Sequence, residues 1–106
     1  MESEKIVEEA RRRQSVFREI QKYLIIIKDV IRNKIDATAE VYLFGSVAGG
    51  DYVYSSDIDV LVVSDEKPER IRVALWEAGI EEPFEIIVLP KERLEGFKAR
   101  AKLIHV

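Results

Sequence analysis

The sequence contains no cysteine, which excludes disulfide bonds and metal sites built on thiolates. Histidine is almost as scarce: the single one, His105, stands next to the last residue, and we expect it on the surface. A long hydrophobic run is also missing. The longest uninterrupted one, from Leu24 to Ile27, is far too short to cross a membrane.

An excess of positive charge is missing as well. The formal net charge of the 106 residues is −3, which argues against nonspecific nucleic-acid binding, because such binding neutralises phosphates with a basic surface. The stretch MESEKIVEEARRR at the start is charged and has no apolar centre, so it is unlike a signal peptide. We therefore expect a cytoplasmic protein that does not enter a membrane.

What the sequence does contain is enough apolar residues for one core. Hydrophobic residues make up 47% of the chain, and its length is typical of a single domain spanning residues 1–106. The N-terminal segment 1–34 is predicted to be helical from about residue 3, because apolar side chains recur at three- and four-residue spacing between Phe17 and Ile31.

Two features of this helix have more than one interpretation. Ile25 and Ile26 widen the apolar stripe, either to complete the core or to form a face that binds a partner in a homo- or hetero-oligomer. The arginine run at residues 11–13 is either a solvated face of the helix or an RNA-binding site, and we favour the solvated face because glutamates lie beside it and the net charge is acidic.

The rest of the chain alternates between apolar strands and amphipathic helices. The order helix–strand–strand–helix–strand–helix predicts an α/β (α+β) fold, a small mixed sheet of three to four strands packed with helices. Trp76 is expected in the core, and the C-terminal tail either continues the last helix or adds an edge strand. We expect strands at residues 41–44, 58–63 and 84–89, and helices from Pro68 to a stop at Gly79 and from Lys91 to about Ala101.

The stretch from Leu43 to Val63 carries the chemistry. Asp57 and Asp59 open the second strand, and because side chains alternate along a strand, both carboxylates point to one face. Two such charges repel each other unless a cation lies between them, and hard oxygen ligands suit Mg²⁺. Gly45 lets the backbone approach a ligand, and Ser46 offers a hydroxyl and an N–H to a phosphate. These parts predict a nucleotide-handling site.

Two-metal phosphoryl transfer usually needs a third acidic ligand. Glu85 in the third strand is either this ligand or simply a residue at the exposed start of its strand. It shares a face with Asp59 if the second and third strands are neighbours. Ser56 either turns the backbone before the second strand or contacts a phosphate. Tyr52 and Tyr54 either stack on a base or cover loop backbone.

Gly45-Ser46, an interval of ten residues and Asp57-x-Asp59 on an apolar strand together resemble the signature of the DNA polymerase β-like nucleotidyltransferase superfamily. The flanking LFGS and SDIDVLVV are most similar to minimal nucleotidyltransferases, called MNT proteins. These small prokaryotic domains are often encoded beside a helical HEPN partner, as the antitoxin of a toxin–antitoxin pair. The resemblance covers residues 41–90, the motif-bearing core.

The resemblance implies a nucleotidyltransferase fold and a role for each motif residue. Gly45 and Ser46 would hold phosphates of a nucleoside triphosphate, and Asp57, Asp59 and Glu85 would be catalytic and coordinate two Mg²⁺ ions. The implied reaction is transfer of AMP from ATP, the substrate, to a tyrosine hydroxyl of the HEPN toxin. Larger members carry a helical domain that binds the acceptor; here we expect another polypeptide to supply it.

Two departures from the family pattern suggest alternatives. Many members have arginines where this chain has Val47 and Gly49, and aspartate is more common than Glu85. A second hypothesis is therefore a weak or inactive module that neutralises a partner by binding it. A third is a transferase acting on a small molecule or nucleic acid, which the acidic charge disfavours.

Overall fold

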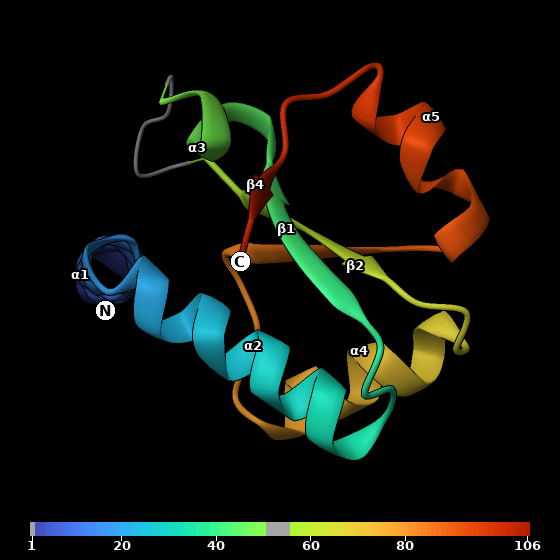
Figure 1. Ribbon diagram of the computed structural model, residues 1–106. Helices are drawn as coiled ribbons and strands as arrows, with labels where there is room; N and C mark the ends of the chain where they lie inside the picture. Colours follow the sequence, from blue (N-terminus) through green and yellow to red (C-terminus); the bar gives the residue numbers. More distant parts are fainter. Residues whose placement is uncertain (1, 51–55) are drawn as a thin grey trace.

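The computed structural model describes residues 2–50 and 56–106 (Figure 1). Helices cover both faces of a four-stranded mixed sheet, which confirms the predicted α+β architecture. The elements are α1 (Glu2–Arg18), α2 (Ile20–Lys34), β1 (Glu40–Phe44), α3 (Gly45–Gly49), β2 (Ile58–Val63), α4 (Pro68–Glu77), β3 (Phe84–Leu89), the 3₁₀ turn η1 (Lys91–Arg93), α5 (Leu94–Lys98) and β4 (Ile104–His105).

The strands lie in the order β3-β2-β1-β4. β1 pairs antiparallel with both β2 and β4, whereas β2 and β3 are parallel and are joined through α4. A parallel pair needs such a long crossover, while the antiparallel pairs do not. The C-terminal tail forms the short edge strand β4, one of its two expected outcomes. There the exposed His105 ring packs 4.8 Å from the Tyr42 ring.

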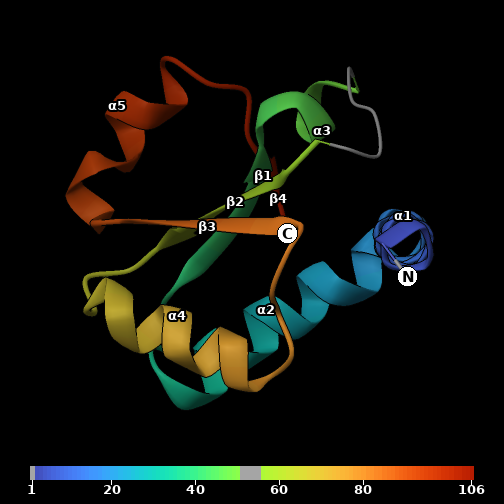
Figure 2. The ribbon, with the colours of Figure 1, turned by 180° about the vertical axis from the view of Figure 1, so that it is seen from behind.

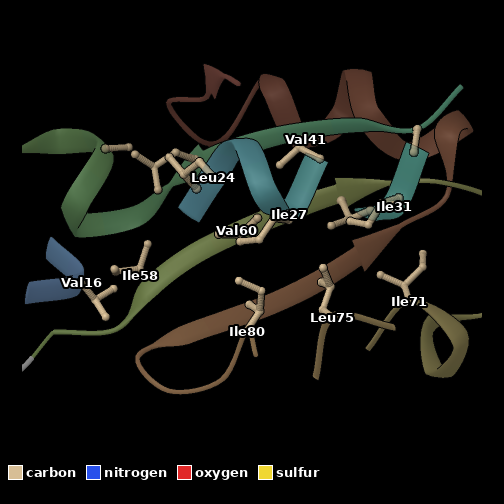
Figure 3. Close-up of a cluster of buried hydrophobic side chains, with 14 of the residues drawn as sticks. Val16, Leu24, Ile27, Ile31, Val41, Ile58, Val60, Ile71, Leu75 and Ile80 are labelled. Carbon is tan, nitrogen blue, oxygen red and sulfur yellow. The ribbon is translucent and has the colours of Figure 1, made fainter. Parts of the chain in front are cut away.

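The larger core lies between the sheet and two helices, α2 and α4 (Figure 3). Side chains at three- and four-residue spacing on each helix meet the alternate residues of β1 and β2 that point the same way. The labelled residues that are almost fully inaccessible are Leu24, Ile27, Ile31, Val41, Ile58, Val60, Ile71 and Leu75.

A smaller core lies on the opposite face of the sheet, under η1 and α5 (Figure 2). Tyr42, Leu61 and Val63 are buried there, and the Phe44 and Phe97 rings meet edge to face at 5.4 Å. Because both faces are covered, the central strands are apolar on both sides, as the sequence predicts. None of the helices in residues 2–50 and 56–106 is long and apolar enough to span a membrane.

The prediction of one helix over residues 3–34 is wrong, because the helix breaks at Glu19. Figure 1 shows α1 almost along its axis, whereas α2 runs across the view, so the chain bends sharply at the break. The bend keeps Val16 and Phe17 buried and lets α1 run toward the start of β2 and β3. The final helix is also shorter than predicted, since α5 ends at Lys98.

The prediction that Trp76 lies in the core is wrong: it is 68% exposed. Its neighbour Leu75 points into the core with Ile71, and one residue further along a helix is a rotation of about 100°. The two isoleucines with alternative interpretations divide in the same way. Ile26 packs against the core, whereas Ile25 points to solvent.

Candidate active site

Two carboxylates meet across the parallel strands. Asp59 of β2 is in register with Glu85 of β3, so the two residues lie side by side on the sheet. The prediction that these residues share a face when the strands are neighbours is therefore confirmed. A hydrogen bond from the Ile58 N–H to the Pro83 carbonyl, with a distance of 2.8 Å, fixes the beginning of this strand pair.

The surroundings of Asp59 disfavour its charged form. Partial burial raises the pKa of the Asp59 carboxyl, and the negative charges of Glu85 and Asp57 and the hydrogen bond with Glu85 raise it further. Glu85 and Asp57 are exposed, so Asp59 is the innermost member of this acidic group. A bound cation would remove the repulsion that raises this pKa.

Gly45 lies directly against the Asp59 carboxylate. Phe44, the last residue of β1, is in register with Asp59, and the chain then turns through Gly45 with a φ of +75°. An ideal Cβ placed at Gly45 would lie 2.1 Å from Asp59 Oδ2, far closer than atoms can approach. A residue other than glycine would therefore meet both a strained backbone and a steric clash.

The remaining motif residues lie on α3 and just before β2. Ser46 is exposed in the first turn of α3, and Ser56 is half-buried at the entry to β2. Val47 packs against the larger core, whereas a side chain at Gly49 would meet open space. The predictions for Tyr52 and Tyr54 lie outside the described residues.

Sequence reasoning missed Arg13. Its guanidinium donates to the Ser56 carbonyl at 3.1 Å, pairs with Glu82 at 2.6 Å and lies 3.8 Å from Asp57 Oδ1. Its side chain is 18% exposed, so the interpretation of residues 11–13 as a solvated face is wrong for Arg13. The local sequence does not show that Arg13 reaches the site and Arg11 does not, because the position of Arg13 depends on the bend between α1 and α2.

The family follows from the sequence that surrounds this site. A sequence model of the family described as "Nucleotidyltransferase domain" matches residues 24–105. The chain belongs to this nucleotidyltransferase family. The match includes every element from β1 to β4, whereas Arg13 and the rest of α1 precede it.

Two crystal structures are similar to this nucleotidyltransferase domain. One is a candidate nucleotidyltransferase from Sulfolobus solfataricus, 29% identical, with a TM-score of 0.42; the match covers 79% of this chain and 82% of that one. The other is also described as a candidate nucleotidyltransferase, 29% identical, with a TM-score of 0.49 and coverage of 85% and 96%. Among curated proteins, none matches this chain significantly.

The acidic residues of this nucleotidyltransferase have the chemistry of a magnesium site, since all of them offer carboxylate oxygens. Asp59 and Glu85 already face each other, and their mutual repulsion favours a cation. Within the described part of the chain, no group of three acidic, histidine or cysteine side chains is placed to hold a metal ion. A three-carboxylate site would therefore need Asp57, Asp59 and Glu85 to come closer together than they lie here.

Proposed function

We propose that this nucleotidyltransferase transfers a nucleoside monophosphate, AMP from ATP, to a hydroxyl of a partner protein in a Mg²⁺-dependent reaction. The observation that carries the proposal is the Asp59 carboxylate, which lies against the backbone of Gly45 and is in register with Glu85 on the neighbouring strand. This arrangement supports the proposal, because the carboxylate that would bind a cation lies next to the turn that would bind phosphate.

Each residue of the site would have a distinct role. Asp57, Asp59 and Glu85 would hold two Mg²⁺ ions, which supply charge stabilisation to the acceptor hydroxyl and to the leaving pyrophosphate when bound. Ser46 would bind a phosphate oxygen through its exposed hydroxyl. Gly45 would let the phosphate approach the backbone, because no side chain stands in the way.

The transfer is an in-line displacement at the α-phosphorus of ATP. The acceptor oxygen forms a bond to this phosphorus, and the bond to the β-phosphate bridging oxygen breaks. Pyrophosphate leaves with the electron pair, and the hydroxyl proton passes to a carboxylate of the site or to water. Asp59 and Glu85, on adjacent strands, would help to hold the reacting groups in line, and such positioning lowers the barrier of a displacement reaction.

The proposed partner is a helical HEPN-type toxin, whose modification on a tyrosine would make this chain its antitoxin. The motifs LFGS and SDIDVLVV support this role, because they are most similar to those of minimal nucleotidyltransferases. The proposal follows from this resemblance, and its direct test is transfer of label from α-labelled ATP to a purified HEPN protein.

A second candidate function is neutralisation of the partner by binding alone. The specific observation in its favour is the engagement of Asp57 by Arg13, which leaves Asp59 and Glu85 as the facing pair. Val47 supports it too. Many family members have an arginine at this position, whereas Val47 packs against the larger core and contributes no positive charge to the site. Under this function, a variant without its acidic pair still binds and blocks the partner.

Calorimetric titration with ATP, with and without Mg²⁺, separates the two functions. We expect metal-dependent binding to the wild type and its loss in the double variant Asp57→Asn, Asp59→Asn. Asp29→Asn is the control for the type of substitution, because it removes one carboxylate charge from an exposed position on α2. Binding that survives in the double variant would contradict the proposed site. Absence of binding in every protein, with the fold intact, would favour neutralisation alone.

A further inference from the structure

Helix α1 places a basic side chain at the edge of the acidic site. Arg13 reaches Asp57 from a helix that precedes the part of the chain matched by the family. One side of its guanidinium pairs with Glu82 at 2.6 Å, and the other donates to the Ser56 carbonyl at 3.1 Å. The side chain is therefore held at the entry to β2, where the acidic motif begins.

The contacts of Arg13 with Glu82 and with Asp57 differ in strength. The contact with Glu82 is short and charge-assisted, whereas the 3.8 Å separation from Asp57 is at the outer limit of an ion pair. Asp57 is more than half exposed, so water weakens this pair further. A divalent cation held by Asp57 and Asp59 would therefore displace Arg13 from Asp57 without removing it from Glu82.

The proposed nucleotide site also needs a basic group, and α3, which would bind the phosphates, does not contain one. The sequence of α3, GSVAG, has no cationic side chain. A triphosphate and the three carboxylates together carry more negative charge than two Mg²⁺ ions balance, and an arginine fork matches two phosphate oxygens at once. Arg13 is the guanidinium that the described structure places beside Asp57.

There is space beside Arg13 for part of a nucleotide. A groove of about 510 Å³ lies between α1 and the acidic site, and Ala10, Arg13, Gln14, Asp57 and Glu82 are among its lining residues. This volume falls within the usual range for small-molecule sites, about 300 to 1,000 Å³. The groove contacts the site through Asp57 and α1 through Arg13.

We propose that Arg13 is a substrate-binding residue: without metal it neutralises Asp57, and when Mg²⁺ binds it turns to the triphosphate. The inference rests on the proposed nucleotide site and adds α1 to it. It requires Arg13 to weaken metal binding and to strengthen nucleotide binding, because Arg13 competes with the metal for Asp57 but attracts the phosphates.

The test measures these two equilibria by calorimetry in wild type, Arg13→Gln and Arg12→Gln. Arg12 is the matched control, since its polar partners within the described residues, Glu81 and the Glu82 carbonyl, also attach α1 to the β3 entry. With Mn²⁺ alone, we expect Arg13→Gln to bind about two- to fivefold more tightly, because a weak competitor is gone. With Mg²⁺ and ATP, we expect its affinity for ATP to fall about ten- to a hundredfold. Arg12→Gln should change neither.

Each alternative result has a defined meaning. If Arg13→Gln weakens both equilibria, or behaves as Arg12→Gln does, Arg13 merely anchors α1 and the proposal is overturned. Tighter Mn²⁺ binding with unchanged affinity for ATP would also overturn it, because no phosphate contact would be lost. Failure of the wild type to bind ATP with Mg²⁺ would instead refute the proposed function, and this inference with it.

Arg13→Lys is a second variant, which tests the proposal even if Arg13→Gln does not fold. Lysine keeps the positive charge but cannot form the two parallel hydrogen bonds of a guanidinium. We expect an affinity for Mg²⁺–ATP between those of wild type and Arg13→Gln, with Mn²⁺ binding close to that of wild type. Affinity for Mg²⁺–ATP equal to that of wild type would overturn the proposed two-pronged phosphate contact.

Discussion

The Asp59 carboxylate lies where a side chain at Gly45 would begin, with only 2.1 Å between Oδ2 and an ideal Cβ. Gly45 follows directly after β1, Asp59 lies on the neighbouring antiparallel strand β2, and the register Phe44 to Asp59 brings them together. Glycine is therefore required at position 45 for two separate reasons, the carboxylate and a φ of +75°. The relationship joins the expected phosphate turn to the expected metal ligand.

Gly45→Ala should damage both stability and nucleotide binding. A non-glycine residue at this φ costs about 1 to 2 kcal/mol, and the clash forces Asp59 away from its position. Gly79→Ala is the matched control, because Gly79 has a φ of +85° but open space around its Cα. Thermal unfolding should show a loss in both variants, whereas Mg²⁺-dependent ATP binding should fail in Gly45→Ala alone. Normal ATP binding by Gly45→Ala would contradict the arrangement.

Asp59→Asn should remove Mg²⁺-dependent ATP binding without lowering stability. The substitution relieves repulsion between Asp59, which is half-buried, and Glu85, while the amide still fits the same space. We expect the melting temperature to stay level or rise by about 4 °C, the effect of roughly 1 kcal/mol in a domain of this size. Asp29→Asn serves as the control for charge removal. A large drop in melting temperature would show that Asp59 is a structural residue.

Asp36 should make stability depend on acidity below pH 4. Hydrogen bonds from Thr38 and Ser64 lower the pKa of the Asp36 carboxyl from 3.8 to about 2. The folded state therefore favours the ionised form, so its stabilisation is complete above pH 4 and disappears as pH falls toward 2. We expect Asp36→Asn to destabilise the protein by about 1 to 2 kcal/mol at pH 7.

Denaturant unfolding of wild type and Asp36→Asn at several pH values provides the measurement. The difference in free energy of unfolding between the two proteins should shrink between pH 4 and pH 2, while other groups titrate equally in both. A difference that stays constant over this range would show that the ionised carboxylate is not the stabilising form. Ser64, whose hydroxyl donates to the Asp36 carboxylate, is 1% exposed, so this hydrogen bond lies in the packed interior.

Truncation of two adjacent residues of α4 should lower stability by very different amounts. Leu75 is buried against the larger core, so Leu75→Ala should lose about 2 to 5 kcal/mol of unfolding free energy. Trp76 is largely exposed, so Trp76→Ala should lose less than about 1 kcal/mol. Chemical denaturation measures both, and tryptophan fluorescence of the wild type should be that of a solvated ring. A loss from Trp76→Ala as large as that from Leu75→Ala would mean that another surface covers Trp76.

Apolar periodicity was enough to locate most of the fold. The stretches 58–63 and 84–89 are strands in the structure at the residues predicted. Pro68 begins α4, and Gly79 follows its end with a positive φ, as expected from the conformations that these residues favour. Such features depend on local sterics and on alternation, both of which the sequence contains.

The wrong prediction for Trp76 arises because a helix presents several faces and the sequence does not say which one meets the sheet. Trp76 is apolar and lies beside Leu75, but only one of the two can point inward. The break at Glu19 has no glycine or proline to announce it, and it arises because buried Val16 and Phe17 and the contacts of Arg13 hold α1 in another direction.

By itself, the sequence determined the spacing of Gly45, Ser46, Asp57 and Asp59, and with it the family resemblance and the chemistry to expect. The tertiary structure decided which of the other charged residues join them. Parallel pairing of β2 with β3 brings Glu85 to Asp59, and the bend after α1 brings Arg13 to Asp57. Local spacing constrains residues on one strand, whereas contacts between residues 26 and 44 positions apart depend on strand order and helix packing, which the whole core sets together.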